Sequence, residues 1–210
     1  MEINDQQYNR ILEVVMEAFI KNGVKATTMD SLASALQMSK RTLYEIFGNK
    51  EETFREAHKY FHRKIANTLK EIFSSSDNVM EGIIRCFLYN RDLMSNLNVD
   101  FIRDMEEYAH HNKSEENKRR HYQNLHDVLK KGVEEGYVRD DINLMLQCYL
   151  LTIQMEALKR SEDLIIKDIS LLEVFDNIIL GFLRAISTSK GLLELERYTP
   201  FLSLTKKADQ

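Results

Sequence analysis

Positively charged and hydroxyl side chains gather in one short stretch of the chain, residues 39–50. Lys40, Arg41 and Lys50 stand there against a single acidic residue, Glu45, although the 210-residue chain carries a net charge of −4. Arg and Lys side chains can bond to the edges of guanine, and Thr and Tyr side chains can reach DNA phosphates or thymine methyl groups. The residue types in this stretch therefore favour contact with nucleic acid.

Two short helices are predicted to hold these side chains. Thr28 precedes a helix over residues 29–36 and Ser39 precedes a second over 40–47, and both residue types are favoured N-caps. The second helix has an apolar stripe of Leu43, Ile46 and Phe47, which leaves these side chains facing outward: Lys40, Arg41, Thr42, Tyr44 and Glu45. Two short helices joined by a tight turn, the second with basic groups at an N-terminus that favours phosphate, are typical of a helix-turn-helix.

The flanking segments complete a small helical domain. A first helix is predicted over residues 4–22, with Asn4 and Gln7 as a capping box and Gly23 as its C-cap. A long helix over residues 50–73 follows Asn49, which forms a capping pair with Glu52. Helices of about eight residues are too short to be stable alone, so these elements must pack together. We predict a three-helix DNA-binding domain over residues 1–50, joined to the rest of the chain by the long helix.

The remainder of the sequence also predicts helices. One proline and seven glycines are few helix breakers for a chain of 210 residues. After a break at Ser74-Ser75-Ser76-Asp77, Gly132 and Gly136 flank one helix end, and a short helix is expected after Ser189. The apolar spacing predicts the other helices over 78–95, 99–111, 115–135, 142–161 and 171–188. The fold class is therefore all-α, with residues 51–210 forming a larger helical domain.

The pattern of residues 11–51 resembles one known family. The run Ile11-x6-Ala18-Phe19-x3-Gly23-x3-Thr27-Thr28-x3-Leu32-Ala33, followed by Met38-Ser39-Lys40-x-Thr42-Leu43-Tyr44-x2-Phe47-x2-Lys50-Glu51, is similar to the N-terminal signature of the TetR family of transcription regulators. That family usually has glycine where this chain has Gln37, at a turn position that tends to need positive φ. Glutamine there either costs about 1 kcal/mol or forces another turn geometry.

The resemblance implies roles for individual residues. Lys40, Thr42 and Tyr44 are implied at the DNA face, with Thr28 and Lys50 bound to phosphates on either side. The full set of predicted DNA-binding residues is Thr28, Ser39, Lys40, Arg41, Thr42, Tyr44 and Lys50. Other readings stay open: Tyr44 can pack on the domain, Thr28 can be a cap alone, and Glu45 either accepts from cytosine N4 or points away.

In that family the C-terminal helices form a ligand cavity and a dimer interface, and the resemblance implies both here. Side chains that suit a ligand pocket, although each also suits a plain core, are Phe87, Phe101, Met105, Tyr108, Tyr122, Cys148, Tyr149 and Thr152. Candidates for a dimer interface on the last long helix are Phe175, Ile178, Gly181 and Phe182. Gly181 fits close approach of a partner helix or a close contact within the chain.

Metal and enzyme chemistry find little support in the sequence. His58 and His62 lie four residues apart on one helix face without an HExxH pattern, so a surface pair is expected there. The remaining histidines show no ligand spacing: His110, His111, His121 and His126. Paired Glu-x-x-His motifs, a phosphate loop and a nucleophile elbow are absent, and Cys86 and Cys148 are expected to be free thiols. We expect no metal, no cofactor and no enzyme activity.

The predicted function is that of a ligand-released repressor. A homodimer would read a palindromic DNA operator with recognition helices about 34 Å apart, and an apolar or amphipathic small molecule would favour the DNA-incompetent state. The chain lacks an apolar run long enough for a membrane span and a secretory signal, so a cytoplasmic protein is expected. The alternative is a helical small-molecule-binding or adaptor module without DNA binding. Gln37 and the eight basic against nine acidic residues in residues 1–60 favour that alternative.

Overall fold

The computed structural model describes residues 4–98, 100–102, 104, 115–159 and 170–198, and over 115–121 it describes the backbone alone. In this part of the chain every regular element is an α-helix, and the other backbone pairing is an isolated bridge between Val138 and Ser187. The predicted all-α fold is confirmed. The chain divides into two compact units: unit 1 comprises Met1–Thr68 and Asn96–Ala109, and unit 2 comprises Leu69–Ser95 and His110–Gln210.

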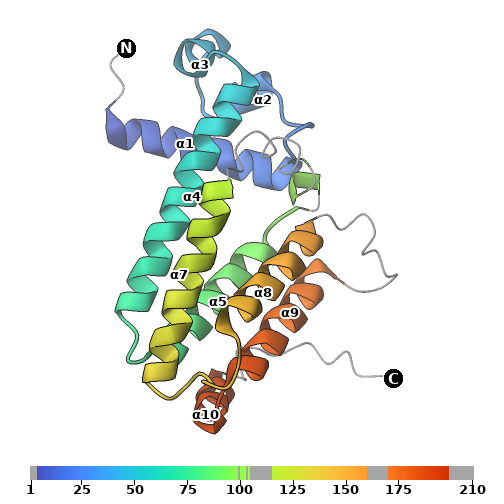
Figure 1. Cartoon of the computed structure of the whole chain (residues 1–210). Helices are drawn as coiled ribbons and strands as arrows, with labels where there is room; N and C mark the ends of the chain where they lie inside the picture. The colour runs from blue at the N-terminus through green and yellow to red at the C-terminus, as the bar shows by residue number, and fades with distance from the viewer. Residues whose placement is uncertain (1–3, 99, 103, 105–114, 160–169, 199–210) are drawn as a thin grey trace. The chain divides into compact units, whose positions relative to one another are not determined.

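Unit 1 contains α1 (Asp5–Asn22), α2 (Met29–Ala35), α3 (Lys40–Phe47) and most of α4 (Lys50–Ser74) (Figure 1). The Asn4 side chain accepts a hydrogen bond from the Gln7 N–H at 2.9 Å, and the Gln7 side chain accepts from the Asn4 N–H at 3.2 Å. Gly23 closes α1 at a φ of 82°, in the region that favours glycine. The predicted capping box and the predicted C-cap of this helix are therefore confirmed.

One apolar core holds the helices of unit 1 together. Leu12 and Phe19 of α1, Leu32 of α2 and Leu43 of α3 are each no more than 1% exposed. The Phe19 ring meets the Phe54 ring of α4 edge to face, with centroids 5.3 Å apart. Each such side chain contributes roughly 1.5–3 kcal/mol when it is fully buried. Helices as short as α2 and α3 depend on this shared core for their stability, which also fixes the surface that α3 presents.

Unit 2 contains α5 (Val79–Ser95), α7 (Glu115–Glu134), α8 (Leu144–Lys159), α9 (Leu171–Ile186) and α10 (Ser189–Tyr198). Its core includes a stack of Phe87 on Phe175, with ring centroids 5.6 Å apart. A buried ion pair joins the same two helices, α5 and α9: Arg91 Nε lies 2.8 Å from Asp176 Oδ1 and 3.0 Å from Oδ2. Burial raises the pKa of the Asp176 carboxyl, while Arg91 acts in the opposite direction.

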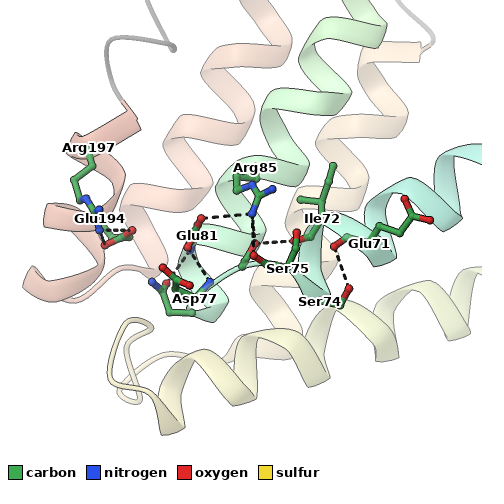
Figure 2. A network of polar contacts seen from close by, with 11 residues as sticks. Glu71, Ile72, Ser74, Ser75, Asp77, Glu81, Arg85, Glu194 and Arg197 are labelled. Atoms are coloured by element: carbon green, nitrogen blue, oxygen red, sulfur yellow. Dashed lines mark hydrogen bonds and ion pairs between the residues drawn. The ribbon is translucent and has the colours of Figure 1, made fainter.

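A polar network forms the connection from α4 to α5 (Figure 2). The Asp77 N–H donates to Glu81 Oε2 at 2.9 Å, and the Arg85 guanidinium donates to the Ser75 carbonyl at 3.3 Å while pairing with Glu81 at 3.5 Å. The hydroxyl of Ser74 donates to the backbone carbonyl of Glu71 in the last turn of α4. This local bonding ends α4 within the break predicted from the run of serines.

The other predicted helices of unit 2 are found within two residues of their expected ends, and the predicted N-cap Ser170 accepts from the Glu173 N–H at 3.1 Å. Of the helix predicted over 99–111, residues 100–102 and 104 are described and all are helical. Gly132 and Gly136 flank the end of α7 at Glu134, as predicted. Gly132 lies inside the helix, where an added Cβ would come within 2.5 Å of the Val138 side chain, and Gly136 follows the helix end at a φ of 76°. No helix in the described part of the chain is long and apolar enough to cross a membrane.

Candidate nucleic-acid interface

The turn between α2 and α3 keeps its shape without glycine. Gln37 adopts a φ of 53°, and no other described residue except glycine has positive φ. The Gln37 N–H donates to the Ser34 carbonyl at 3.1 Å and the Met38 N–H donates to the Ala33 carbonyl at 3.0 Å. These paired bonds are those of a Schellman motif, in which a left-handed residue follows the helix end. The first of the two predicted possibilities therefore holds: the turn has the ordinary geometry and glutamine bears the strain.

Side-chain caps fix the two ends of this turn. Thr28 Oγ1 accepts from the Ser31 N–H at 3.1 Å, and the Ser31 hydroxyl in turn accepts from the Thr28 N–H at 3.0 Å. Ser39 Oγ accepts from the Thr42 N–H at 3.0 Å and lies 2.7 Å from the Thr42 hydroxyl. Both predicted N-caps are confirmed. Three hydroxyl groups of the predicted DNA-binding set thus lie at helix N-termini on the surface of unit 1.

The surface of α3 displays basic groups beside acidic ones. Lys40 Nζ lies 2.8 Å from Asp30 Oδ1 of α2, and the hydrogen bond to this carboxylate raises the pKa of the Lys40 ammonium. Arg41 Nε lies 2.9 Å from Glu45 Oε1, one helical turn further along α3. All four side chains are exposed, Arg41 the most at 88%. Contacts of this kind contribute between zero and about 1 kcal/mol to stability, so they exchange readily for another partner.

The opposite face of α3 is anchored as predicted. Leu43 is fully buried and Phe47 is 6% exposed, while Ile46 packs against the same core. Tyr44 points away from this core and is 42% exposed. The exposure leaves its ring and hydroxyl available on the same surface as Lys40 and Arg41.

Lys50 has a partner that the sequence did not indicate. Its Nζ donates to the backbone carbonyl of Lys25 at 2.9 Å, and burial lowers the pKa of the Lys50 ammonium. The same residue, Lys25, is also bonded to Asp104: the Lys25 N–H donates to Asp104 Oδ2 at 2.7 Å, and Asp104 is only 4% exposed. The carbonyl explains why a cation can stand at the start of α4, where it opposes the helix dipole. Sequence reasoning missed Asp30, Lys25 and Asp104, since no short-range pattern links them to their partners.

The predicted ligand residues that the structure describes are distributed over the two units. Phe101 lies in the core of unit 1, with its ring 6.4 Å from that of Phe54. Phe87 and Cys148 are buried in the core of unit 2, and burial raises the pKa of the Cys148 thiol to about 11. Met105 and Tyr108 lie outside the described residues.

Two predicted ligand residues lie at a hollow of unit 2. The rings of Tyr122 and Tyr149 are 6.1 Å apart, and the Thr152 hydroxyl is occupied by the Cys148 carbonyl at 3.0 Å. The hollow has a volume of about 340 Å³ and is lined by Tyr122, Asn143, Met145, Leu146 and Tyr149. Apolar groups dominate this lining.

The dimer candidates on α9 differ in exposure. Phe175 is 4% and Phe182 is 9% exposed, and both pack in the core of unit 2, so their place in a dimer interface stays a prediction. Gly181 is exposed, and a Cβ added there would meet no atom within 4 Å. Among the described residues, none makes the close contact within the chain that was one explanation of Gly181. On α8 a stripe of large apolar side chains, which we term the α8 stripe, is 43–51% exposed: Met145, Leu146, Tyr149, Leu150 and Ile153.

The histidine pair on α4 is close. His58 Nε2 lies 3.0 Å from His62 Nε2, and burial together with His62 lowers the pKa of His58 to about 4. Among the described residues no three His, Cys, Asp or Glu side chains are grouped so that they could hold a metal ion. His110 and His111 lie outside the described residues, as does the side chain of His121.

Comparison with known proteins points to the same part of the chain. The family described as bacterial regulatory proteins, tetR family, matches residues 11–57. The uncharacterized HTH-type transcriptional regulator YhgD of Bacillus subtilis (strain 168) is 39% identical over 71 residues, which are 34% of this chain and 34% of that protein. This match thus spans about a third of the length of that relative.

Longer matches extend beyond the helix-turn-helix. The HTH-type transcriptional repressor KstR2 of Mycobacterium tuberculosis is 23% identical over 151 residues, 69% of this chain and 75% of that protein. Its solved structure, described as a ketosteroid transcriptional regulator, has a TM-score of 0.57 at 20% identity and covers 90% of this chain and 98% of that one. A structure described as the basis for control of antibiotic production by bacterial hormones has a TM-score of 0.68 at 15% identity, covering 89% and 100%. At these identities the solved structures show a shared fold.

Proposed function

This chain belongs to the TetR family of bacterial regulatory proteins, which are DNA-binding transcription regulators, and we propose that it is a homodimeric repressor that a small molecule releases from a palindromic operator. The observation that carries the proposal is the α2–turn–α3 unit. Its Schellman turn at Gln37 and its N-cap at Ser39 set the N-terminal end of α3 on the surface of unit 1. A recognition helix reads the major groove with the residues of that end.

Each residue of the proposed interface has a defined task. Arg41 and Lys40 bond to guanine O6 and N7, and Tyr44 contacts a phosphate or a thymine methyl group. The hydroxyls of Thr28, Ser39 and Thr42 bond to phosphates beside the groove. Lys50 reaches a phosphate by exchanging its bond to the Lys25 carbonyl. Phosphate contacts position the protein on the duplex, and the base contacts select the sequence.

A dimer is proposed because a two-fold operator requires two recognition helices, and the α8 stripe and exposed Gly181 support it. Soluble monomers rarely expose adjoining apolar side chains such as Tyr149, Leu150 and Ile153. At Gly181 the absence of a side chain allows a second backbone to approach closely. We assign Ile178, Gly181 and the part of the α8 stripe that does not line the hollow, Leu150 and Ile153, to this interface, in which each contact occurs twice around the symmetry axis.

The effector is proposed to be an apolar or amphipathic small molecule bound by unit 2. The apolar hollow beside Tyr122 and Tyr149 supports this chemistry, as does the ketosteroid named for the relative KstR2. A ligand that binds one conformation of the dimer more tightly shifts the population towards it, and the same coupling weakens ligand binding when DNA is bound. Substitution of Tyr122 by alanine is expected to weaken release by the effector without weakening DNA binding.

Selection from a randomised duplex library tests the proposal. Wild-type protein is expected to enrich a palindromic sequence, and the variant Lys40→Ala/Tyr44→Ala is expected to bind that sequence at least about thirtyfold more weakly, since each base contact contributes roughly 1–3 kcal/mol. Lys70→Ala, an exposed lysine twenty residues beyond the start of α4, removes a positive charge as a control and is expected to bind normally. If folded wild-type protein enriches no sequence even at low salt, the DNA-binding function is wrong and the helical ligand-binding module replaces it.

A further inference from the structure

The basic side chains of the proposed DNA surface all have partners in the free protein. Arg41 pairs with Glu45, Lys40 pairs with Asp30, and Lys50 is bonded to the Lys25 carbonyl. The two carboxylates balance the two basic side chains of α3. The surface that must approach a polyanion therefore presents little net positive charge.

This balance weakens binding that depends on phosphates alone. Non-specific affinity arises from cations that neutralise phosphates and release counterions. When Arg41 turns to a phosphate, Glu45 loses its partner and remains one helical turn away, with its charge facing the duplex. The repulsion between this carboxylate and the phosphates opposes the contact that Arg41 has made.

Arg41 and Glu45 can both be satisfied on one kind of sequence. They lie on the same face of α3, four residues apart, and are 88% and 62% exposed. Arg pairs with guanine O6 and N7, and a carboxylate accepts from the N4 amino group of cytosine. Where neighbouring base pairs offer a guanine and a cytosine in the major groove, the ion pair opens and each partner gains a base. Asp30 lies on α2, the first helix of the motif, which crosses the DNA backbone in a helix-turn-helix complex, so we assign it no base.

We propose that Glu45 is a specificity-determining residue that holds Arg41 in the free protein and reads a cytosine when Arg41 binds an adjacent guanine. The inference rests on the proposed DNA-binding function. It assigns Asp30 a different task, because that carboxylate weakens all DNA binding alike. The two acidic residues of the surface are therefore distinguishable by experiment.

Binding of two duplexes to the full-length protein tests the assignment: the operator selected from the randomised library, and a shuffled duplex of the same composition. Glu45→Ala is expected to strengthen binding to the shuffled duplex about tenfold and to steepen its salt dependence by about 0.9 per protomer, because Arg41 becomes free for phosphate. Binding to the operator is expected to stay unchanged or to weaken, because the cytosine contact is lost. A new selection with Glu45→Ala is expected to lose the preference for cytosine at one half-site position.

Asp30→Ala is the matched control, since it removes the same charge and also frees a cation of the same surface. It is expected to strengthen binding to both duplexes by the same factor. If Glu45→Ala also strengthens both equally, or leaves the shuffled duplex unchanged, or keeps every base preference, the assignment is wrong. If folded wild-type protein shows no preference between any sequences, the DNA-binding function itself fails before the variants are compared and the inference fails with it.

Discussion

Two exposed surfaces of this molecule have opposite chemistry. On α3 in unit 1 the exposed groups are charged and paired, Lys40 with Asp30 and Arg41 with Glu45. On α8 in unit 2 they are large and apolar, and nothing within the described chain covers Tyr149 or Leu150 enough to bring either below 44% exposure. A surface of exchangeable ion pairs suits a hydrated, polyanionic partner, whereas an apolar stripe suits a dry and lasting contact. The comparison predicts that the two surfaces respond to substitution in different ways.

The largest effect is expected where a charge enters the α8 stripe. Leu150→Lys/Ile153→Lys would bury unpaired charges in a dimer interface, twice because of the symmetry, and should raise the dimer dissociation constant at least about 100-fold. Analytical ultracentrifugation measures the change. Gln123→Lys on α7 adds the same kind of charge at an exposed polar position and should leave the dimer intact. If the double variant remains dimeric at nanomolar concentration, the α8 stripe is not part of the dimer interface.

The next effect compares a buried ion pair with an exposed one. Asp176→Ala leaves the Arg91 guanidinium without the carboxylate that accepts from its Nε, and we expect the free energy of unfolding to fall by about 3 kcal/mol. Asp30→Ala breaks the exposed pair with Lys40 and should change stability by less than about 0.5 kcal/mol. Urea denaturation of both variants measures the contrast. Equal losses would show that the pairs on α3 are structural and not exchangeable.

A smaller effect concerns pH and His58 of α4. The folded-state pKa of His58 is about 4, below its ordinary value of 6.5, so the unfolded chain takes up a proton first as pH falls. Stability should therefore be complete above pH 6.5 and decline by roughly 1–3 kcal/mol as the pH falls from 6.5 to 4. His58→Gln should flatten this part of the profile in denaturation measured at several pH values. If the slope of stability against pH is the same in wild type and in His58→Gln, groups other than His58 cause it.

The smallest effect is expected at the turn itself. Gln37→Gly relieves a left-handed residue that bears a Cβ, but it also increases the entropy of the unfolded chain. The net result should be a gain in stability of about 0.5 kcal/mol, with DNA binding unchanged because the Schellman bonds remain. Gln37→Ala keeps the Cβ and should give no such gain. Thermal denaturation of the two variants side by side would detect the difference, and a loss of stability in Gln37→Gly would contradict the strain at this position.

The sequence predicted unit 1 more fully than unit 2 because the determinants of unit 1 are local. A capping box such as Asn4 with Gln7 is made within four residues, and the turn that places Gln37 is made within six. The stack of Phe87 on Phe175 and the ion pair of Arg91 with Asp176 join residues more than eighty positions apart. No periodicity encodes such partners, so the sequence could not indicate that Phe175 packs in the core of unit 2. Nor does any sequence pattern indicate that Phe101 lies beside Phe54, far back in the chain.

Unit 1 is built from two separate stretches of chain, and this has a consequence for how the protein is made. Its core includes Phe101, and its loop before α2 is bonded to Asp104, although both follow the whole of α5. During synthesis the first 68 residues therefore leave the ribosome without the groups that finish their own core. At the usual 5–20 residues per second the nascent chain waits roughly 2–7 s for residue 104 to be added. Over that interval the recognition helix exists only in an unfinished domain, so newly made protein gains its DNA-binding surface only after unit 2 has begun to emerge.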